Sequence, residues 1–331
     1  MPRFILRRAY FAILTILLVS IVVYGVFSIL PFDPAALTCG QKCTPAIVEA
    51  NRVKLGFDKP LWEQYWLFLS GIFLGRTYGA GSAEFTCPAP SFGYSFNENT
   101  CVTDMLKEAL PVTINLAIGA FVIWMVVGVG LGLIAAKFRG RYPDTLSSVF
   151  VLLGTSLPTF VTGLFFLIYV TIKWKIVPLS LKGYVSLTDD PVRYFQYFIL
   201  PWLTLAILYA AFYTRFTRAT VLETLGEDYI RTARAKGLSE KTVLLKHTMR
   251  AALAPITTSA SLDIAGLIGG AIITESIFNL AGLGRMTLQS VYEFDLSVVV
   301  ATTILAATVV ISMNLIVDIA YGYLDPRVRV K

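Results

Sequence analysis

The run LPVTINLAIGAFVIWMVVGVGLGLIAA, residues 110–136, carries no charged side chain. A helix needs roughly 20 largely apolar residues to cross the hydrocarbon core of a bilayer, and this run exceeds that length. No water inside the bilayer can satisfy free backbone amides and carbonyls, so the run must pair them internally as a helix. It therefore predicts a transmembrane helix.

The rest of the chain is of the same character. Of its 331 residues 56% are apolar and 15% charged, and the mean hydropathy of +0.69 is too high for an ordinary soluble domain. Six spans are predicted, near residues 9–30, 110–136, 146–172, 195–213, 255–278 and 296–321. The predicted fold class is an all-α integral membrane protein with six transmembrane helices.

Basic residues are concentrated in alternate loops. The N-terminal segment, residues 137–141, residues 215–250 and the C-terminal tail together hold 17 of the 28 Lys and Arg residues. Cationic loops resist translocation, so both termini are predicted to be cytoplasmic. Topology thus explains the net charge of +7, and no nucleic-acid partner is expected because no readout motif accompanies the basic residues.

The first span has an alternative interpretation as a cleaved signal peptide, because Arg3, Arg7 and Arg8 precede it. A signal-peptide core has roughly 7 to 15 residues and ends at small residues. This apolar run is longer and ends in Leu30-Pro31, so we interpret it as a retained helix.

Three regions are expected. They are the cytoplasmic N-terminus with the first span (1–30), an extracytoplasmic subdomain (31–107), and a core of five further spans (108–331) that includes a long cytoplasmic loop at 223–252. The subdomain contains all four cysteines of the chain, which are Cys39, Cys43, Cys87 and Cys101. Thiols on that side of the membrane are usually oxidised, so disulfides are predicted.

Four cysteines allow three pairings, and the most local one joins Cys39 to Cys43 and Cys87 to Cys101. The alternative is a zinc site, since C-x3-C is an acceptable ligand spacing. Against zinc, the single histidine, His247, is cytoplasmic, and the separation of Cys87 from Cys101 is not that of paired ligands.

Polar residues inside the spans are candidates for a translocation pathway, because a carboxylate near the bilayer centre costs about 2.5 to 3.5 kcal/mol. Asp263 is expected on one helical stripe with Gly266, Gly270 and Thr274. It has two interpretations, a wet pathway or a buried ion pair. The other candidates are Glu275 on the fifth span and Asn314 and Asp318 on the sixth. For Asp318 we favour an ion pair with Arg215 or Arg218.

The cytoplasmic loop contains EDYIRTARAKGLSE, residues 227–240, which predicts a helix, a break and a second helix. Acidic residues begin the first helix and basic residues end it, as the helix dipole favours. Gly237 suits the C-terminal cap and Ser239 a new N-cap. Tyr229, Ile230 and Ala233 would share an apolar face that docks on a partner or lies on the surface.

This loop resembles the coupling loop of the permease family of dipeptide and oligopeptide ABC importers, which carries D-Y-[IV]-R-x-A-R-A-K-G-L. Relative to the broader importer motif E-A-A-x3-G, Ala233 and Gly237 are retained, but Arg231 and Thr232 replace the first two residues. The resemblance continues in LGFDKPLWEQY (55–65), GGAIITESIF (269–278), AGLGR (281–285) and VDIAYGYLDPRVR (317–329). It implies ATPase-coupling roles for Glu227, Asp228, Tyr229, Arg231, Ala233, Arg234, Lys236 and Gly237.

The resemblance also implies partners and a function. This chain would lie in the lipid of the inner membrane. Its partners would be a second homologous permease, two cytoplasmic ATPase subunits and an extracytoplasmic peptide-binding protein. The complex would import di- or oligopeptides by alternating access. ATP and Mg²⁺ would bind the ATPase subunits, because this chain has no G-x4-G-K-[ST] phosphate loop and is not expected to be an enzyme. Nickel complexes and glutathione are alternative substrates within the family.

Two alternatives come from other classes of protein. A self-sufficient secondary transporter would show internal repeats, and no clear repeat is visible. A membrane enzyme would show a metal-ligand cluster or a nucleophile with its base, and neither is visible.

Overall fold

The computed structural model describes residues 2–29, 44–55, 58–78, 85–95, 97–178 and 183–324. Its contacts divide the chain into two compact units. The first unit consists of Met1–Thr113, Ile268–Ile272 and Ala281–Lys331, and the second of Ile114–Leu267 and Ile273–Leu280.

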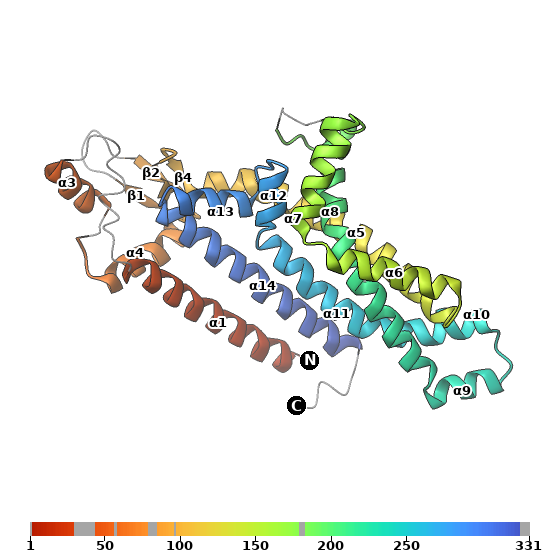
Figure 1. Cartoon of the computed structure of the whole chain (residues 1–331). Helices are drawn as coiled ribbons and strands as arrows, with labels where there is room; N and C mark the ends of the chain where they lie inside the picture. Colours follow the sequence, from red (N-terminus) through yellow and green to blue (C-terminus); the bar gives the residue numbers. More distant parts are fainter. Residues whose placement is uncertain are drawn as a thin grey trace. The chain divides into compact units, whose positions relative to one another are not determined.

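Helices dominate both units (Figure 1). In chain order they are α1 (Pro2–Ile29), α3 (Pro45–Leu55), α4 (Leu61–Leu74), α5 (Val102–Lys137), α6 (Tyr142–Ser156), α7 (Thr159–Phe165), the π-helix η3 (Phe166–Lys173), α8 (Pro191–Leu225), α9 (Asp228–Ala235), α10 (Glu240–Thr242), the π-helix η4 (Val243–Thr248), α11 (Met249–Ile268), α12 (Ile272–Ile277), α13 (Leu283–Tyr292) and α14 (Leu296–Leu324). In the described part of the chain, four short strands form two antiparallel pairs: β1 (Arg76–Tyr78) with β2 (Phe85–Cys87), and β3 (Tyr94–Ser95) with β4 (Thr100–Cys101).

The predicted spans correspond to helices. Among the described residues, five helices are long and apolar enough to cross a membrane, and the bent pair formed by α6 with α7 and η3 supplies a sixth. That pair bends by 97° next to Pro158, which cannot donate a backbone hydrogen bond. The third span is therefore not the single straight helix that the sequence predicts. Pro111 and Pro201, in contrast, lie inside the continuous helices α5 and α8.

The fifth span ends earlier than predicted. Helix α11 ends at Ile268, and a separate short helix, α12, follows. The break is at Gly270, whose φ of +129° is rarely adopted by other residues. A Cβ at Gly270 would lie 2.9 Å from the Cα of Gly284, so only glycine allows this approach. The prediction that Asp263 and Thr274 share one helical stripe is therefore wrong.

In the first unit, α14 is the central helix. Helix α1 lies along it in Figure 1, and α4 adds Phe68 to a cluster with Val300 and Ile304 of α14. The start of α5 packs on α13 and α14 through Val102, Leu283 and a few neighbours. In lipid these contacts stabilise by close packing more than by water exclusion.

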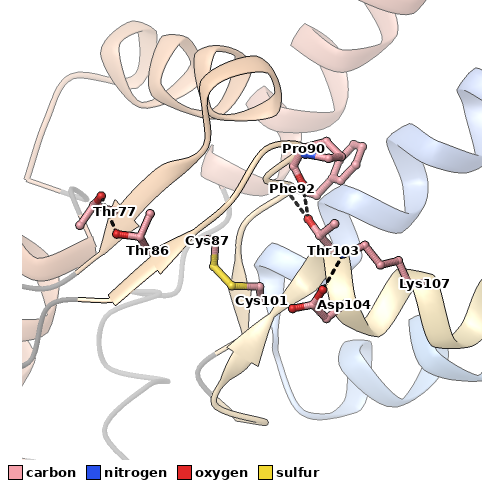
Figure 2. Close-up of a disulfide and its surroundings, with 9 residues drawn as sticks. All are labelled: Thr77, Thr86, Cys87, Pro90, Phe92, Cys101, Thr103, Asp104 and Lys107. Atoms are coloured by element: carbon pink, nitrogen blue, oxygen red, sulfur yellow. Dashed lines mark hydrogen bonds and ion pairs between the residues drawn. A yellow bond between two sulfur atoms is a disulfide. The ribbon is translucent and has the colours of Figure 1, made fainter.

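A disulfide joins the two hairpins of this unit. Cys87 of β2 bonds to Cys101 of β4, directly before α5 begins, as Figure 2 shows. The side chain of Thr103, in the first turn of α5, accepts a hydrogen bond from the Phe92 amide. The predicted pairing of Cys87 with Cys101 is confirmed, whereas Cys39 and Cys43 lie outside the described residues.

In the second unit, α5 approaches α8 closely because glycines line the contact. A Cβ at Gly119 would lie 2.0 Å from the indole of Trp202, and one at Gly128 would lie 2.7 Å from Tyr213. Asn115 fixes the same contact, because its side-chain oxygen accepts from the Tyr194 hydroxyl at 2.7 Å and its carbonyl from the Trp202 indole at 3.0 Å. Gly119 and Gly128 of the second predicted span thus serve tight helix packing.

Candidate coupling loop and translocation pathway

The loop between the fourth and fifth spans folds as a helix, a break and a helix, as predicted. Helix α9 begins after Glu227, and Gly237, with a φ of +78°, ends it. Ser239 then caps α10 by accepting a hydrogen bond from the Thr242 amide. Glu227 occupies the N-cap position of α9 without a capping side-chain hydrogen bond. The turn between the two helices thus depends on the left-handed conformation at Gly237.

Helix α9 presents its apolar residues to its own chain. Ile230 is fully buried and Ala233 is 7% exposed, and both pack against Val243 of η4 and Leu225 of α8. The expectation that Ala233 lies on an outward docking face is therefore wrong. Packing of Ile230 and Ala233 against these neighbours fixes the helix. The outward face consists of polar residues together with Ala235 and with Tyr229, which is 46% exposed.

Charged residues surround this exposed face. Asp228, Arg231, Arg234 and Lys236 are all exposed. Arg234 donates from Nε and a terminal nitrogen to both carboxylate oxygens of Glu240, at 2.8 and 3.2 Å, across the turn at Gly237. An exposed pair of this kind contributes about 0.2 to 1 kcal/mol, so it orients the loop more than it stabilises it. Burial raises the pKa of Tyr229, with Glu227 adding to the effect, so its hydroxyl stays neutral at physiological pH.

Leu225 connects the loop to the spans. It packs on the cluster formed by Ile230, Ala233 and Val243. It also packs on a second cluster, in which Val221 of α8 meets residues from α5, η4 and α11, namely Ala136, Leu244, Met249 and Ala252. Close-packed side chains transmit displacement with little compliance. A displacement of α9 therefore acts on the ends of three long helices at once.

Asp263, the first pathway candidate, is half-buried on α11. Its carboxylate accepts a hydrogen bond from the hydroxyl of Tyr213 on α8. Tyr213 is fully buried, and Trp124 of α5 stacks near both Tyr213 and Tyr209. A tyrosine hydroxyl thus contacts the carboxylate where the buried-pair interpretation expected a cation, and this hydrogen bond lowers the cost of burying the group.

The other pathway candidates lie elsewhere. Thr274 and Glu275 are on α12 and are 2% and 0% exposed. Asn314 is exposed on α14, and the side chain of Asp318 lies outside the described residues. The structure therefore does not bring the predicted polar residues of the fifth span onto one face.

An ion pair that the sequence analysis missed lies near the ends of α6 and α8. Arg218 donates to both carboxylate oxygens of Asp144 at 2.7 and 2.9 Å, and the Gly140 amide donates to the same carboxylate. Arg218 is thus already paired with a residue other than Asp318, the partner we expected. Asp144 is the only acid between Lys137 and the third predicted span, which is a signal that could have found it.

No group of three or more potential metal ligands from His, Cys, Asp and Glu occurs among the residues that the structure describes. Two other features are of functional interest: the exposed loop packed onto the ends of the spans, and the polar groups held between the spans.

Comparisons with known proteins agree with these features. Residues 128–330 match the family model of the binding-protein-dependent transport system inner membrane component, and residues 1–117 match its N-terminal family. The chain is 35% identical, over 100% of both chains, to the glutathione transport system permease protein GsiC of Shigella flexneri. It is 37% identical, over 99% of both chains, to a putative peptide transport system permease protein of Brucella abortus.

A solved structure shares the fold. The MetNI methionine ABC transporter, in an inward-facing conformation, aligns with a TM-score of 0.51 and 18% identity, over 67% of this chain and 97% of that chain. The resemblance that the coupling-loop motif predicted is thereby confirmed. This chain is a multi-pass inner-membrane protein that belongs to the family of binding-protein-dependent transport system inner membrane components, as a permease of the peptide and oligopeptide ABC importer branch.

Proposed function

We propose that this permease imports di- or oligopeptides across the cytoplasmic membrane by alternating access. The observation that carries the proposal is full-length similarity to a peptide permease, together with an exposed coupling loop packed onto the span ends. Permeases of this family are not enzymes, and ATP hydrolysis resides in separate subunits. ATP with Mg²⁺ would therefore act on this chain only indirectly, through the contact between the ATPase subunits and the permease.

The proposed complex contains a second, homologous permease, two cytoplasmic ATPase subunits and an extracytoplasmic peptide-binding protein. Both termini would be cytoplasmic, because the basic residues concentrate in the loops on their side. ATPase closure would displace α9 at its exposed residues, chiefly Tyr229, Arg231 and Lys236. Leu225 would pass that displacement to the spans as a rigid-body movement.

Glutathione is the second candidate substrate, because GsiC carries that name and spans the whole of this chain. Glutathione is itself a small peptide, so one site chemistry suits both substrates. A nickel complex is the remaining alternative within the family.

For the translocation pathway, the hydrogen bond between Tyr213 and Asp263 supports Asp263 best among the candidate residues.

The test is uptake by the reconstituted complex in liposomes loaded with ATP and Mg²⁺. Labelled tripeptide, glutathione and a nickel chelate would be offered separately, each with the binding protein present. We expect ATP-dependent uptake of the tripeptide and competition by unlabelled peptides. Uptake of glutathione alone would reassign the substrate, and uptake by the isolated chain driven by an ion gradient would overturn the importer mechanism.

A further inference from the structure

The second unit contains a cavity of about 340 Å³ between η3, α8 and the segment after α12. Its walls are mainly apolar and include Leu200, Ile277 and Phe278. Three polar side chains also line it, those of Thr171, Gln196 and Asn279. Small-molecule sites measure roughly 300 to 1,000 Å³, so this cavity has room for one residue of a chain and not for a whole oligopeptide.

These three polar side chains have no hydrogen-bond partner among the described residues. Thr171 is only 7% exposed, and most buried polar side chains in proteins are hydrogen-bonded. Many other helical threonines here, such as Thr204 and Thr214, bond to the carbonyl four residues earlier, and Thr171 does not. Gln196 is half-buried and Asn279 is exposed, so these two amides and the Thr171 hydroxyl can offer both donors and acceptors to an occupant of the cavity.

The backbone around the cavity is irregular. Thr171 lies on the π-helix η3, and π-helical turns are frequent at functional sites. Asn279 has a φ of +56°, in the left-handed region. At membrane depth, irregular backbone is tolerated where it is buried in protein or lines a water-filled cavity. Substrate sites in transporters are typically formed by discontinuous helices, and the cavity lies beside the short helix α12 that follows the break at Gly270.

From these observations we infer that the cavity is a subsite that takes one apolar residue of the transported peptide. The side chain of that residue would pack on Leu200, Ile277 and Phe278, and its peptide group would pair with Gln196, Asn279 and the Thr171 hydroxyl. None of the described lining residues is charged, so an acidic or basic side chain would be desolvated without a partner. A lipid acyl chain would leave the amides unpaired. The inference rests on the proposed peptide transport.

The test uses the complete complex in liposomes, with the binding protein saturated so that uptake reports passage through the membrane. Two probes are compared, Ala-Leu-Ala and Ala-Gly-Ala. Thr171→Phe fills the cavity, and Gln196→Leu removes an amide at nearly constant volume. Thr155→Phe and Gln289→Leu are matched controls, because both residues are exposed on helices that do not line the cavity.

We expect Thr171→Phe to lower Ala-Leu-Ala uptake at least about fivefold relative to Ala-Gly-Ala, since an apolar pocket commonly discriminates tenfold or more. Gln196→Leu should lower the uptake of both peptides, and the two control variants should not change the uptake of either peptide. Equal loss of both peptides with Thr171→Phe, or loss of neither in either variant, would overturn the subsite. If the unmodified complex takes up neither peptide, the proposed function fails and the subsite fails with it.

Discussion

Replacing Gly237 with valine changes the turn between α9 and α10 without creating a steric clash. A Cβ built at Gly237 meets no atom within 4 Å, so the substitution acts only through the backbone. The φ of +78° lies in the left-handed region, which costs an L-residue about 1 to 2 kcal/mol, and a β-branched one more. Asparagine tolerates this region, so Gly237→Asn is the matched control.

The strain energy at Gly237 can be compared with the energies of the contacts that hold α9 in place. The exposed Arg234–Glu240 pair contributes about 0.2 to 1 kcal/mol, less than the strain. Burial of Ile230 stabilises by about 1.5 to 3 kcal/mol, which exceeds it. The helix should therefore remain folded on Val243 and Leu225 while the turn shifts. A strain of about 1.4 kcal/mol changes the population of the native turn tenfold.

The assay measures peptide uptake and ATP hydrolysis on the same reconstituted complex, with assembly checked by co-purification. We expect Gly237→Val to lower the number of peptides imported per ATP hydrolysed several-fold. For Gly237→Asn this ratio should stay close to the wild-type value. Hydrogen exchange over residues 228–242 should rise only in the valine variant. Normal coupling in the valine variant, despite raised exchange, would show that this loop does not transmit ATPase motion.

Three further outcomes are expected. Ala233→Asp places a charge in the cluster around Ile230 and should abolish uptake, whereas Ala235→Asp on the exposed side should not; equal effects, measured on the assembled complex, would contradict the burial argument. Cys87→Ser should lower the stability of the two hairpins by about 2 to 3 kcal/mol in thermal unfolding, and Cys101→Ser should lower it by the same amount; free thiols at both positions in unreduced native protein would refute the bond. Burial raises the pKa of Asp295, which accepts from Ser95 before α14, so its proton is held more tightly in the folded state. Local stability should therefore be highest at acidic pH and fall as pH rises from the ordinary aspartate value through the raised pKa, and Asp295→Asn should remove this slope in hydrogen exchange; an unchanged slope would assign it to another group.

The sequence predicts those parts of the structure that local chemistry decides. Uncharged runs identify the spans, since lipid leaves the backbone few alternatives to a helix. The turn at Gly237 and the cap at Ser239 follow from residue preferences that act within a few positions. The bond between Cys87 and Cys101 follows from compartment and proximity in sequence.

The errors concern contacts between distant residues. An amphipathic helix shows which residues share a face, but the pattern does not say whether that face meets the same chain or a partner. The predicted outward position of Ala233 is wrong for this reason, because Val243 and Leu225 cover the residue. Likewise Arg218 pairs with Asp144, which lies 74 residues earlier, and hydropathy carries no information on such pairing.

The breaks within spans have a different cause. Hydropathy measures the preference of side chains for lipid, and it stays high across Gly270 and Pro158 although the helices end there. Every broken turn in a membrane leaves backbone groups that protein, water or substrate must satisfy. A glycine pair or a proline inside an apolar run is therefore better treated as a possible edge of a cavity than as a packing feature. On that rule, Thr274 belongs to a new helix, and the cavity bordered by Asn279 lies where the fifth span was predicted to continue.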